Sequence, residues 1–282
     1  MAVCGNPTKP GEADDPLIST AKNNGIEVYQ PKSWKSQAAL EKMKSFEADF
    51  CLMAYVTKYF PPVVANTPKY GSACFHPSLL PLHRGPSAIS WAIAMGRETT
   101  GVTIFEPTEG LDEGPIIIQK SCEIAPDDTL GDLYSKKLFP MGVDAMVECV
   151  DLVKTRQLSK REQDLSKGSY ESWFRKDAVL VDFTRDVESV YNIIRAANPS
   201  PGAEASYNGC TIKLYDSRKV ADKGCEPGEV VDITDEGVLV QAQGGCILLK
   251  RVESPDGQRC HASKWASEAG LDVGSTFDPS HV

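Results

Sequence analysis

The first half of the chain alternates short apolar runs with stretches of helical periodicity, a pattern typical of a sheet whose strands are joined by helices. Apolar runs that predict strands lie at residues 26–29, 50–54, 73–75, 101–105 and 115–119, and helical patterns lie at residues 14–24, 37–46 and 87–95. Such alternation implies parallel strand pairing. Asp128 or Thr129 caps a further helix, which Pro140 should kink before residues 143–153 continue it. The sequence predicts an α/β fold with a Rossmann-like, doubly wound parallel sheet.

The second half has a different pattern. Residues 157–177 are polar and lose periodicity, as a linker would, and a helix is predicted at residues 187–197. Short strands separated by turn residues follow at 211–215, 228–233, 237–242 and 246–252. Short strands separated by turn residues are typical of a small β-barrel. We therefore expect a catalytic domain at residues 1–157, a linker at 158–177 and a small β-barrel domain at 178–282.

Composition narrows the class of protein. The length of 282 residues allows two domains. No apolar run approaches the roughly 20 residues that a membrane helix needs, and the N-terminus has no signal-type stretch. Nine cysteines are scattered without a C-x-x-C pair, so neither a metal site nor a disulfide framework is indicated. We expect a cytoplasmic protein with reduced thiols, no membrane association and no metal.

The most informative segment follows the strand that ends at Phe75. His76 comes next, and Pro77 and Pro81 hold the following loop extended and rigid. Asp112 lies 36 residues after His76 on a glycine-flanked loop. A carboxylate beside an imidazole would favour the protonated ring, which can stabilise a developing oxyanion. This pair indicates acyl-group chemistry, although a single histidine after a strand is often a hydrogen-bonded structural residue.

These motifs resemble a known family. His-Pro-Ser-Leu-Leu-Pro at residues 76–81, Arg-Gly at 84–85 and Gly-Leu-Asp at 110–112 are similar to the signature of the 10-formyltetrahydrofolate-dependent formyltransferases. The resemblance continues through residues 125–130 and 194–203 and covers nearly the whole chain. It is greatest to the hydrolase domain of 10-formyltetrahydrofolate dehydrogenase and to stand-alone proteins like methionyl-tRNA formyltransferase. The resemblance implies a formyltransferase domain, a C-terminal β-barrel of the formyltransferase type and 10-formyltetrahydrofolate as co-substrate.

One feature of the family has no counterpart here. Members open with a strand, a glycine-containing turn and a helix, whereas residues 1–7 look like the family's second strand. About thirty residues are therefore expected to be missing. In a doubly wound sheet the first strand is central, and its loss would expose the edges of two neighbouring strands. An alternative or misassigned start site is the favoured explanation.

Only some of the family's catalytic residues have a counterpart in this chain. His76 and Asp112 fall on catalytic positions, but Cys74 stands where transferases to amines carry Asn and hydrolase-type relatives carry an apolar residue. Cys74 either fills space at the strand end or accepts the formyl group as a nucleophile. Together with Ser78 and Arg84 it is assigned to a substrate loop. Arg84 either holds that loop or meets an anionic substrate.

The resemblance also implies a place for the pterin ring of the folate. Its predicted contacts come from two segments and are made mainly by the backbone. They are Tyr55, Val56 and Thr57 in the first segment, and Glu109, Gly110 and Leu111 in the second. Tyr55 could stack on the ring or belong to the core.

Three functions fit these observations. The favoured one moves the formyl group of 10-formyltetrahydrofolate to water or to a small amine, with His76 and Asp112 as the catalytic pair; the identity of the acceptor stays open. Methionyl-tRNA formyltransferase is the first alternative. The net charge is −9, and acidic residues also outnumber Lys and Arg after Val187, so binding of tRNA phosphates is not favoured. An inactive folate-binding protein is the second alternative.

Overall fold

The structure is a computed structural model that describes residues 1–56 and 59–279. The chain forms two compact units, each assembled from three stretches of sequence. The first unit comprises Met1–His76, Thr103–Gln119 and Asp144–Ser166, and the second comprises Pro77–Val102, Lys120–Val143 and Lys167–Val282. Both halves of the sequence therefore contribute to the second unit.

The first unit opens with a small parallel sheet and capped helices. Its first six elements are β1 (Ala2–Cys4), α1 (Pro16–Asn23), β2 (Glu27–Tyr29), α2 (Gln37–Ser45), β3 (Cys51–Met53) and α3 (Pro62–Ala65). Helix α1 begins where the side chain of Asp15 accepts a hydrogen bond from Leu17 N, and α2 begins where that of Ser36 accepts one from Ala39 N. These N-caps satisfy amide groups that have no partner within a helix. In the described stretches β1 pairs with β2 alone, which leaves β1 at a sheet edge.

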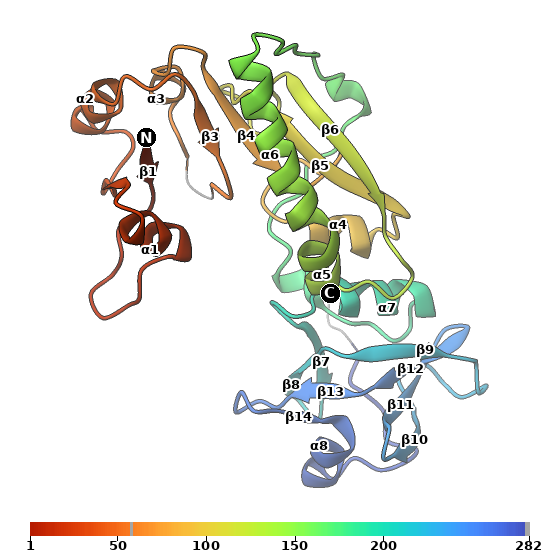
Figure 1. Cartoon of the computed structure of the whole chain (residues 1–282). Helices are drawn as coiled ribbons and strands as arrows, with labels where there is room; N and C mark the ends of the chain where they lie inside the picture. Colours follow the sequence, from red (N-terminus) through yellow and green to blue (C-terminus); the bar gives the residue numbers. More distant parts are fainter. Residues whose placement is uncertain (57–58, 280–282) are drawn as a thin grey trace. The chain divides into compact units, whose positions relative to one another are not determined.

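Figure 1 shows a four-stranded sheet, and His76 is the last residue of one of its strands. Its order is β3–β4–β5–β6, with β4 at Ser72–His76, β5 at Thr99–Phe105 and β6 at Ile116–Glu123. Strands β3 and β4 are parallel, and Val102 and Ile104 of β5 are fully buried in the core. Strand β3 lies at the edge of this sheet, as β1 does in the smaller one.

One predicted pairing is wrong: β5 runs antiparallel to β4, not parallel. The helix between them, α4 (Ala88–Ala94), has seven residues and spans about 10 Å. Strand β5 also has seven residues but spans about 23 Å. The helix alone does not span the length of the strand, and β5 runs back beside β4.

The helical stretch after β6 is distorted near Pro140, as the sequence predicts. Thr129 caps α5 (Leu130–Leu133) through a capping box with Asp132. A π-helical turn at Tyr134–Leu138 follows, and α6 occupies Phe139–Lys154. Pro140 has no amide hydrogen, so it cannot donate the α-helical hydrogen bond to the residue four positions before it. That residue lies in the π-helical turn.

The C-terminal part of the second unit is antiparallel. It contains α7 (Val187–Ala196), β7 (Ala203–Tyr207), β8 (Cys210–Leu214), β9 (Ser217–Val220), β10 (Val230–Thr234), β11 (Gly237–Ala242), β12 (Gly245–Leu249), β13 (Arg251–Glu253), β14 (Arg259–His261) and α8 (Ala262–Ala269). The strands form two four-stranded sheets, β10–β11–β12–β9 and β14–β13–β8–β7. Only Lys250 separates β12 from β13, so the chain turns from one sheet into the other at this corner, as strands of small barrels do. The predicted class, an α/β domain followed by a small antiparallel domain, is confirmed.

Within residues 1–56 and 59–279, no helix is long and apolar enough to cross a membrane.

Candidate active site

His76 is the last residue of β4, and the sheet fixes its position. The residue opposite it in β5 is Thr103. The hydroxyl of Thr103 accepts a hydrogen bond from the side-chain amide of Gln119 at 3.0 Å. The imidazole is buried, with 6% of the residue exposed. His76 is therefore held at the strand end in a largely dry environment.

Asp112 reaches His76 from the loop between β5 and β6. Nδ1 of His76 lies 3.7 Å from Oδ2 of Asp112, and their side chains are 7% and 15% exposed. This is the contact that the sequence predicts. The separation is longer than a direct hydrogen bond, but a protonated imidazole and a carboxylate at this distance would attract each other strongly where water is largely excluded.

The loop that carries Asp112 is closed and tightly packed. Its base is a hydrogen bond from Glu106 N to Pro115 O at 2.9 Å. Gly114 has no room for a side chain, because a Cβ atom there would lie 1.7 Å from the carbonyl oxygen of Glu106. Asp112 itself has φ +56°, in the left-handed region that non-glycine residues rarely occupy. The local backbone is held in an unusual conformation where the carboxylate meets the imidazole.

Cys74 lies two residues before His76, so both side chains project from the same face of β4. Burial raises the pKa of the Cys74 thiol from 9.0 to about 12, and the Asp112 carboxylate adds to the shift. The thiol donates a weak hydrogen bond to Phe75 O at 3.7 Å. A nucleophilic cysteine needs a lowered pKa. These facts support the packing role for Cys74.

The two segments predicted to meet the pterin ring both belong to the first unit. Tyr55 has φ +54° and is 70% exposed, so it is not a core residue. Val56 and Leu111 are also exposed, as is Glu109, and Gly110 is half-buried. Thr57 lies outside the described residues. Exposed apolar side chains in both segments offer surface that a flat ring could cover.

Ser78 and Arg84 belong to the second unit, and there they hold their own loop. The buried hydroxyl of Ser78 donates to Leu82 O at 2.6 Å. Arg84 donates to the carbonyl oxygen of Ser169 from its backbone amide at 3.1 Å and from Nε at 3.3 Å. These bonds support the loop-holding alternative for Arg84.

The polar stretch predicted as a linker also makes contacts with His83. Glu171 Oε2 lies 3.3 Å from Nδ1 of this buried histidine, and the hydroxyl of Ser169 accepts a hydrogen bond from its backbone amide at 2.9 Å. Sequence reasoning missed this role, because the stretch has no apolar periodicity to indicate burial.

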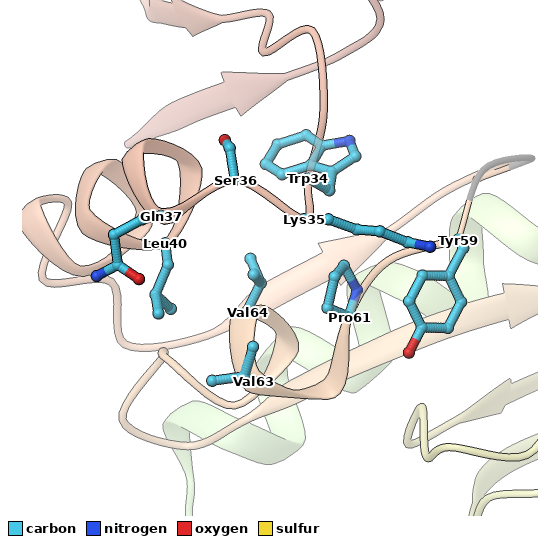
Figure 2. Close-up of a pocket in the computed structure, with 9 residues that line it drawn as sticks. All are labelled: Trp34, Lys35, Ser36, Gln37, Leu40, Tyr59, Pro61, Val63 and Val64. Carbon is cyan, nitrogen blue, oxygen red and sulfur yellow. The ribbon is translucent and has the colours of Figure 1, made fainter.

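A cavity of about 450 Å³ lies beside α2 and α3 in the first unit (Figure 2). Its walls are Trp34, Lys35, Ser36, Gln37, Leu40, Tyr59, Pro61, Val63 and Val64. Lys35 Nζ lies 5.2 Å from the centre of the Tyr59 ring, within the range of a cation–π contact. None of these side chains is a carboxylate or an imidazole, the groups that enzymes use most often for proton transfer.

Metal binding finds no support in the described part of the chain, where no three His, Cys, Asp or Glu side chains are arranged to hold an ion.

The comparisons with known sequences agree on one family. The sequence profile described as formyl transferase matches residues 3–150, and that of the formyl transferase C-terminal domain matches residues 174–270. The mitochondrial 10-formyltetrahydrofolate dehydrogenase of Mus musculus is 34% identical over 282 residues, which cover 95% of this chain and 30% of that protein. The methionyl-tRNA formyltransferase of Thermotoga maritima is 33% identical over 243 residues, 86% of this chain and 77% of that protein. The chain thus spans less than a third of the length of the first relative.

Solved structures share the fold at low identity. HypX from Aquifex aeolicus, in complex with tetrahydrofolic acid, has a TM-score of 0.70 at 19% identity, over 93% of this chain and 45% of that one. WlaRD, a sugar 3N-formyl transferase, has a TM-score of 0.66 at 19% identity, over 88% of this chain and 86% of that one. At such identities the likeness concerns the fold alone.

Proposed function

The chain belongs to the formyl transferase family, and on that premise we propose that it takes the formyl group from 10-formyltetrahydrofolate and passes it to water or to a small amine. The observation that carries this proposal is the contact of His76 Nδ1 with Asp112 Oδ2 at 3.7 Å in a mostly buried site. One similar sequence is a 10-formyltetrahydrofolate dehydrogenase, and on the strength of that similarity we take 10-formyltetrahydrofolate as the formyl donor.

The chemistry assigned to the pair begins with attack on the formyl carbon. A water molecule or amine adds to this carbon, and Asp112 accepts the proton that the nucleophile loses. The formyl oxygen becomes an oxyanion, which the protonated imidazole of His76 stabilises by a hydrogen bond. The bond from carbon to N10 of the folate then breaks, and N10 takes the proton from Asp112. With water as acceptor the products are formate and tetrahydrofolate.

Burial makes the pair effective. A charge–charge contact gains strength when water is excluded, because the local dielectric constant falls. The imidazole is held by the sheet and the carboxylate by a closed loop, so neither group has to reorganise as charge develops. We assign the pterin ring to the surface formed by Tyr55, Val56 and the loop at Glu109, Gly110 and Leu111. Residues 1–157 would then form the catalytic domain and 178–282 the barrel domain.

Water is the favoured acceptor. The residue two before His76 is Cys74, whose neutral thiol is a weak hydrogen-bond donor. The amide of an asparagine would be a stronger second donor to the formyl oxygen. Loss of an oxyanion donor costs about 3 kcal/mol of barrier for either acceptor, and we favour water because the position of Cys74 is the one at which transferases to amines carry Asn and hydrolase-type relatives an apolar residue.

Transfer to methionyl-tRNA is not favoured by the C-terminal part of the second unit. Several of its lysine and arginine side chains form ion pairs with acidic neighbours and are therefore less available to bind the phosphates of a tRNA. The pairs are Lys213 and Arg259 with Glu253, Arg218 with Asp216, Lys219 with Glu188, and Lys264 with Glu268. Phosphate binding draws on cations that neutralise the backbone charge.

Formate release from 10-formyltetrahydrofolate, without any added acceptor, tests the proposal. We expect the wild-type chain to produce tetrahydrofolate and formate in equal amounts, and His76→Ala to lose at least about 100-fold in turnover. The matched control is His261→Ala, which removes an exposed histidine beside Ser263 and should leave turnover unchanged. A wild-type chain that neither releases formate nor formylates any of a panel of small amines would contradict the proposal.

A further inference from the structure

The loop that carries Asp112 is held by a stretch of chain that the sequence predicts to be a linker. Arg161 and Ile116 exchange two backbone hydrogen bonds, at 2.8 and 2.9 Å, at the start of β6. Lys160 Nζ lies 2.6 Å from Glu106 Oε2 at the base of the loop. Residues 160–163 therefore run beside the loop, and all of these contacts fall within the first unit.

Gln163 is the side chain of this stretch that reaches the catalytic turn. Its Nε2 donates to the carbonyl oxygen of Asp112 at 2.9 Å and to that of Gly114 at 2.6 Å. A primary amide nitrogen has two hydrogens, so both serve the same turn. Oε1 of Gln163 is buried and makes no hydrogen bond in the described part of the chain. With the amide reversed, that oxygen would face two carbonyl oxygens, so only the orientation present fits.

The turn needs such support because its backbone is strained. Left-handed backbone is uncommon for residues other than glycine, although aspartate adopts it more often than most, and Asp112 has φ +56°. Gly114, at the other carbonyl, packs so closely against Glu106 that an added Cβ atom would lie 1.7 Å from the Glu106 carbonyl oxygen. Two hydrogen bonds to carbonyls on either side of Glu113 oppose the relaxation that would turn the Asp112 side chain away from His76.

The geometry points to Gln163 as a positioning residue: we propose that its amide holds the Asp112 turn so that the carboxylate meets the imidazole of His76. The catalytic consequence rests on the proposed function, whereas the structural consequence does not. The neighbouring contacts are less able to do this. The pair of Lys160 and Glu106 is partly exposed, and such pairs contribute little. The Arg161 backbone bonds fix the start of β6 and do not reach Asp112.

Gln163→Met removes both donors and nearly preserves the length of the side chain. We expect kcat for formate release to fall about ten- to hundredfold, as for an ångström-scale misplacement of a catalytic group, with KM for the folate within about threefold of wild type. The matched control is Glu162→Met, at the exposed neighbouring position, and it should change neither constant. In an Asp112→Asn background, Gln163→Met should have no further effect, because the carboxylate it positions is already gone.

Equal effects of Gln163→Met with and without the Asp112 carboxylate would overturn the proposal, since a residue that acts through Asp112 cannot behave independently of it. So would wild-type kcat in the Gln163→Met variant.

A crystal structure of Gln163→Met decides the matter without reference to activity. We expect the distance from Asp112 Oδ2 to His76 Nδ1, 3.7 Å in the wild type, to exceed about 5 Å, beyond direct contact. Hydrogen exchange at residues 110–114 should quicken in the same variant. An unchanged distance and unchanged exchange would refute the positioning role even if the wild-type chain proved inactive on the folate, an outcome that would contradict only the proposed function.

Discussion

Replacing Cys74 by Ala or Ser should leave most of the formyl-releasing activity intact. Burial raises the pKa of the thiol from 9.0 to about 12, so at pH 7 only about one molecule in 10⁵ carries the thiolate. An unshifted thiol would carry it in about one molecule in 100. The thousandfold smaller population makes covalent capture of the formyl group slow, and a thiol that only packs is dispensable for the chemistry. We expect kcat within about threefold of wild type.

The stability cost of Cys74→Ala is also bounded. Removing one buried sulfur atom leaves a small void, for which about 1 kcal/mol of the free energy of unfolding is a reasonable estimate. Cys74→Ser keeps nearly the same shape, but its hydroxyl forms stronger hydrogen bonds than a thiol does. Agreement of both kcat values with that of the wild type would show that neither nucleophilicity nor volume at this position limits turnover.

The assay follows tetrahydrofolate formation and, in parallel, the mass of the intact protein during turnover. Thermal unfolding of each variant controls for misfolding. Loss of more than about 100-fold in kcat on a folded Cys74→Ala protein, or a mass increase of one formyl group that maps to Cys74, would refute the reasoning and make the thiol a nucleophile.

The remaining predictions concern the catalytic loop, high pH and tRNA. Gly114→Ala should abolish formate release and lower the free energy of unfolding by about 2 kcal/mol or more, because its Cβ would lie 1.7 Å from the Glu106 carbonyl oxygen; Gly5→Ala, whose Cβ would meet the outer part of the Ile18 side chain, is the control and should keep activity. The free energy of unfolding should be independent of the Cys74 thiol below pH 9 and fall from pH 9 toward 12, because the unfolded chain ionises this thiol first; a urea titration series should show a smaller alkaline loss in Cys74→Ala, and an equal loss would contradict the assigned burial. Initiator tRNA should not bind below micromolar concentration at near-physiological salt; submicromolar binding that weakens steeply with added salt would make tRNA the leading acceptor.

Local rules in the sequence predict much of the fold. The helix at Pro16–Asn23 follows Asp15 and has proline in its first turn, and the strand at Gly237–Ala242 has the expected bounds. Strand β7 was missed although its hairpin with β8 turns at Asn208-Gly209, both with positive φ. This dipeptide is a strong hairpin signal. Its alternating burial was obscured because two of the three buried positions are alanine.

Other features depend on distant parts of the chain. The antiparallel direction of β5 depends on the path of the 22 residues between β4 and β5, which hydrophobic patterning does not reveal. The contact of His76 with Asp112 was predictable, because strand ends and glycine-flanked loops are local signals and the family motif names both residues. Gln163 was not, because a glutamine in a polar stretch has no pattern that distinguishes a solvated side chain from one bonded to two carbonyls 50 residues away.

The central claim is that His76 and Asp112 act as one catalytic unit on 10-formyltetrahydrofolate. Single-turnover formate release by His76→Gln, Asp112→Asn and the double variant tests it most directly. We predict that each single change slows release by about 10³-fold or more, and that the double variant is no slower than the worse single one by more than about threefold, because groups that work together are not additive. Release within tenfold of wild type in either single variant, or losses that multiply in the double variant, would contradict the claim.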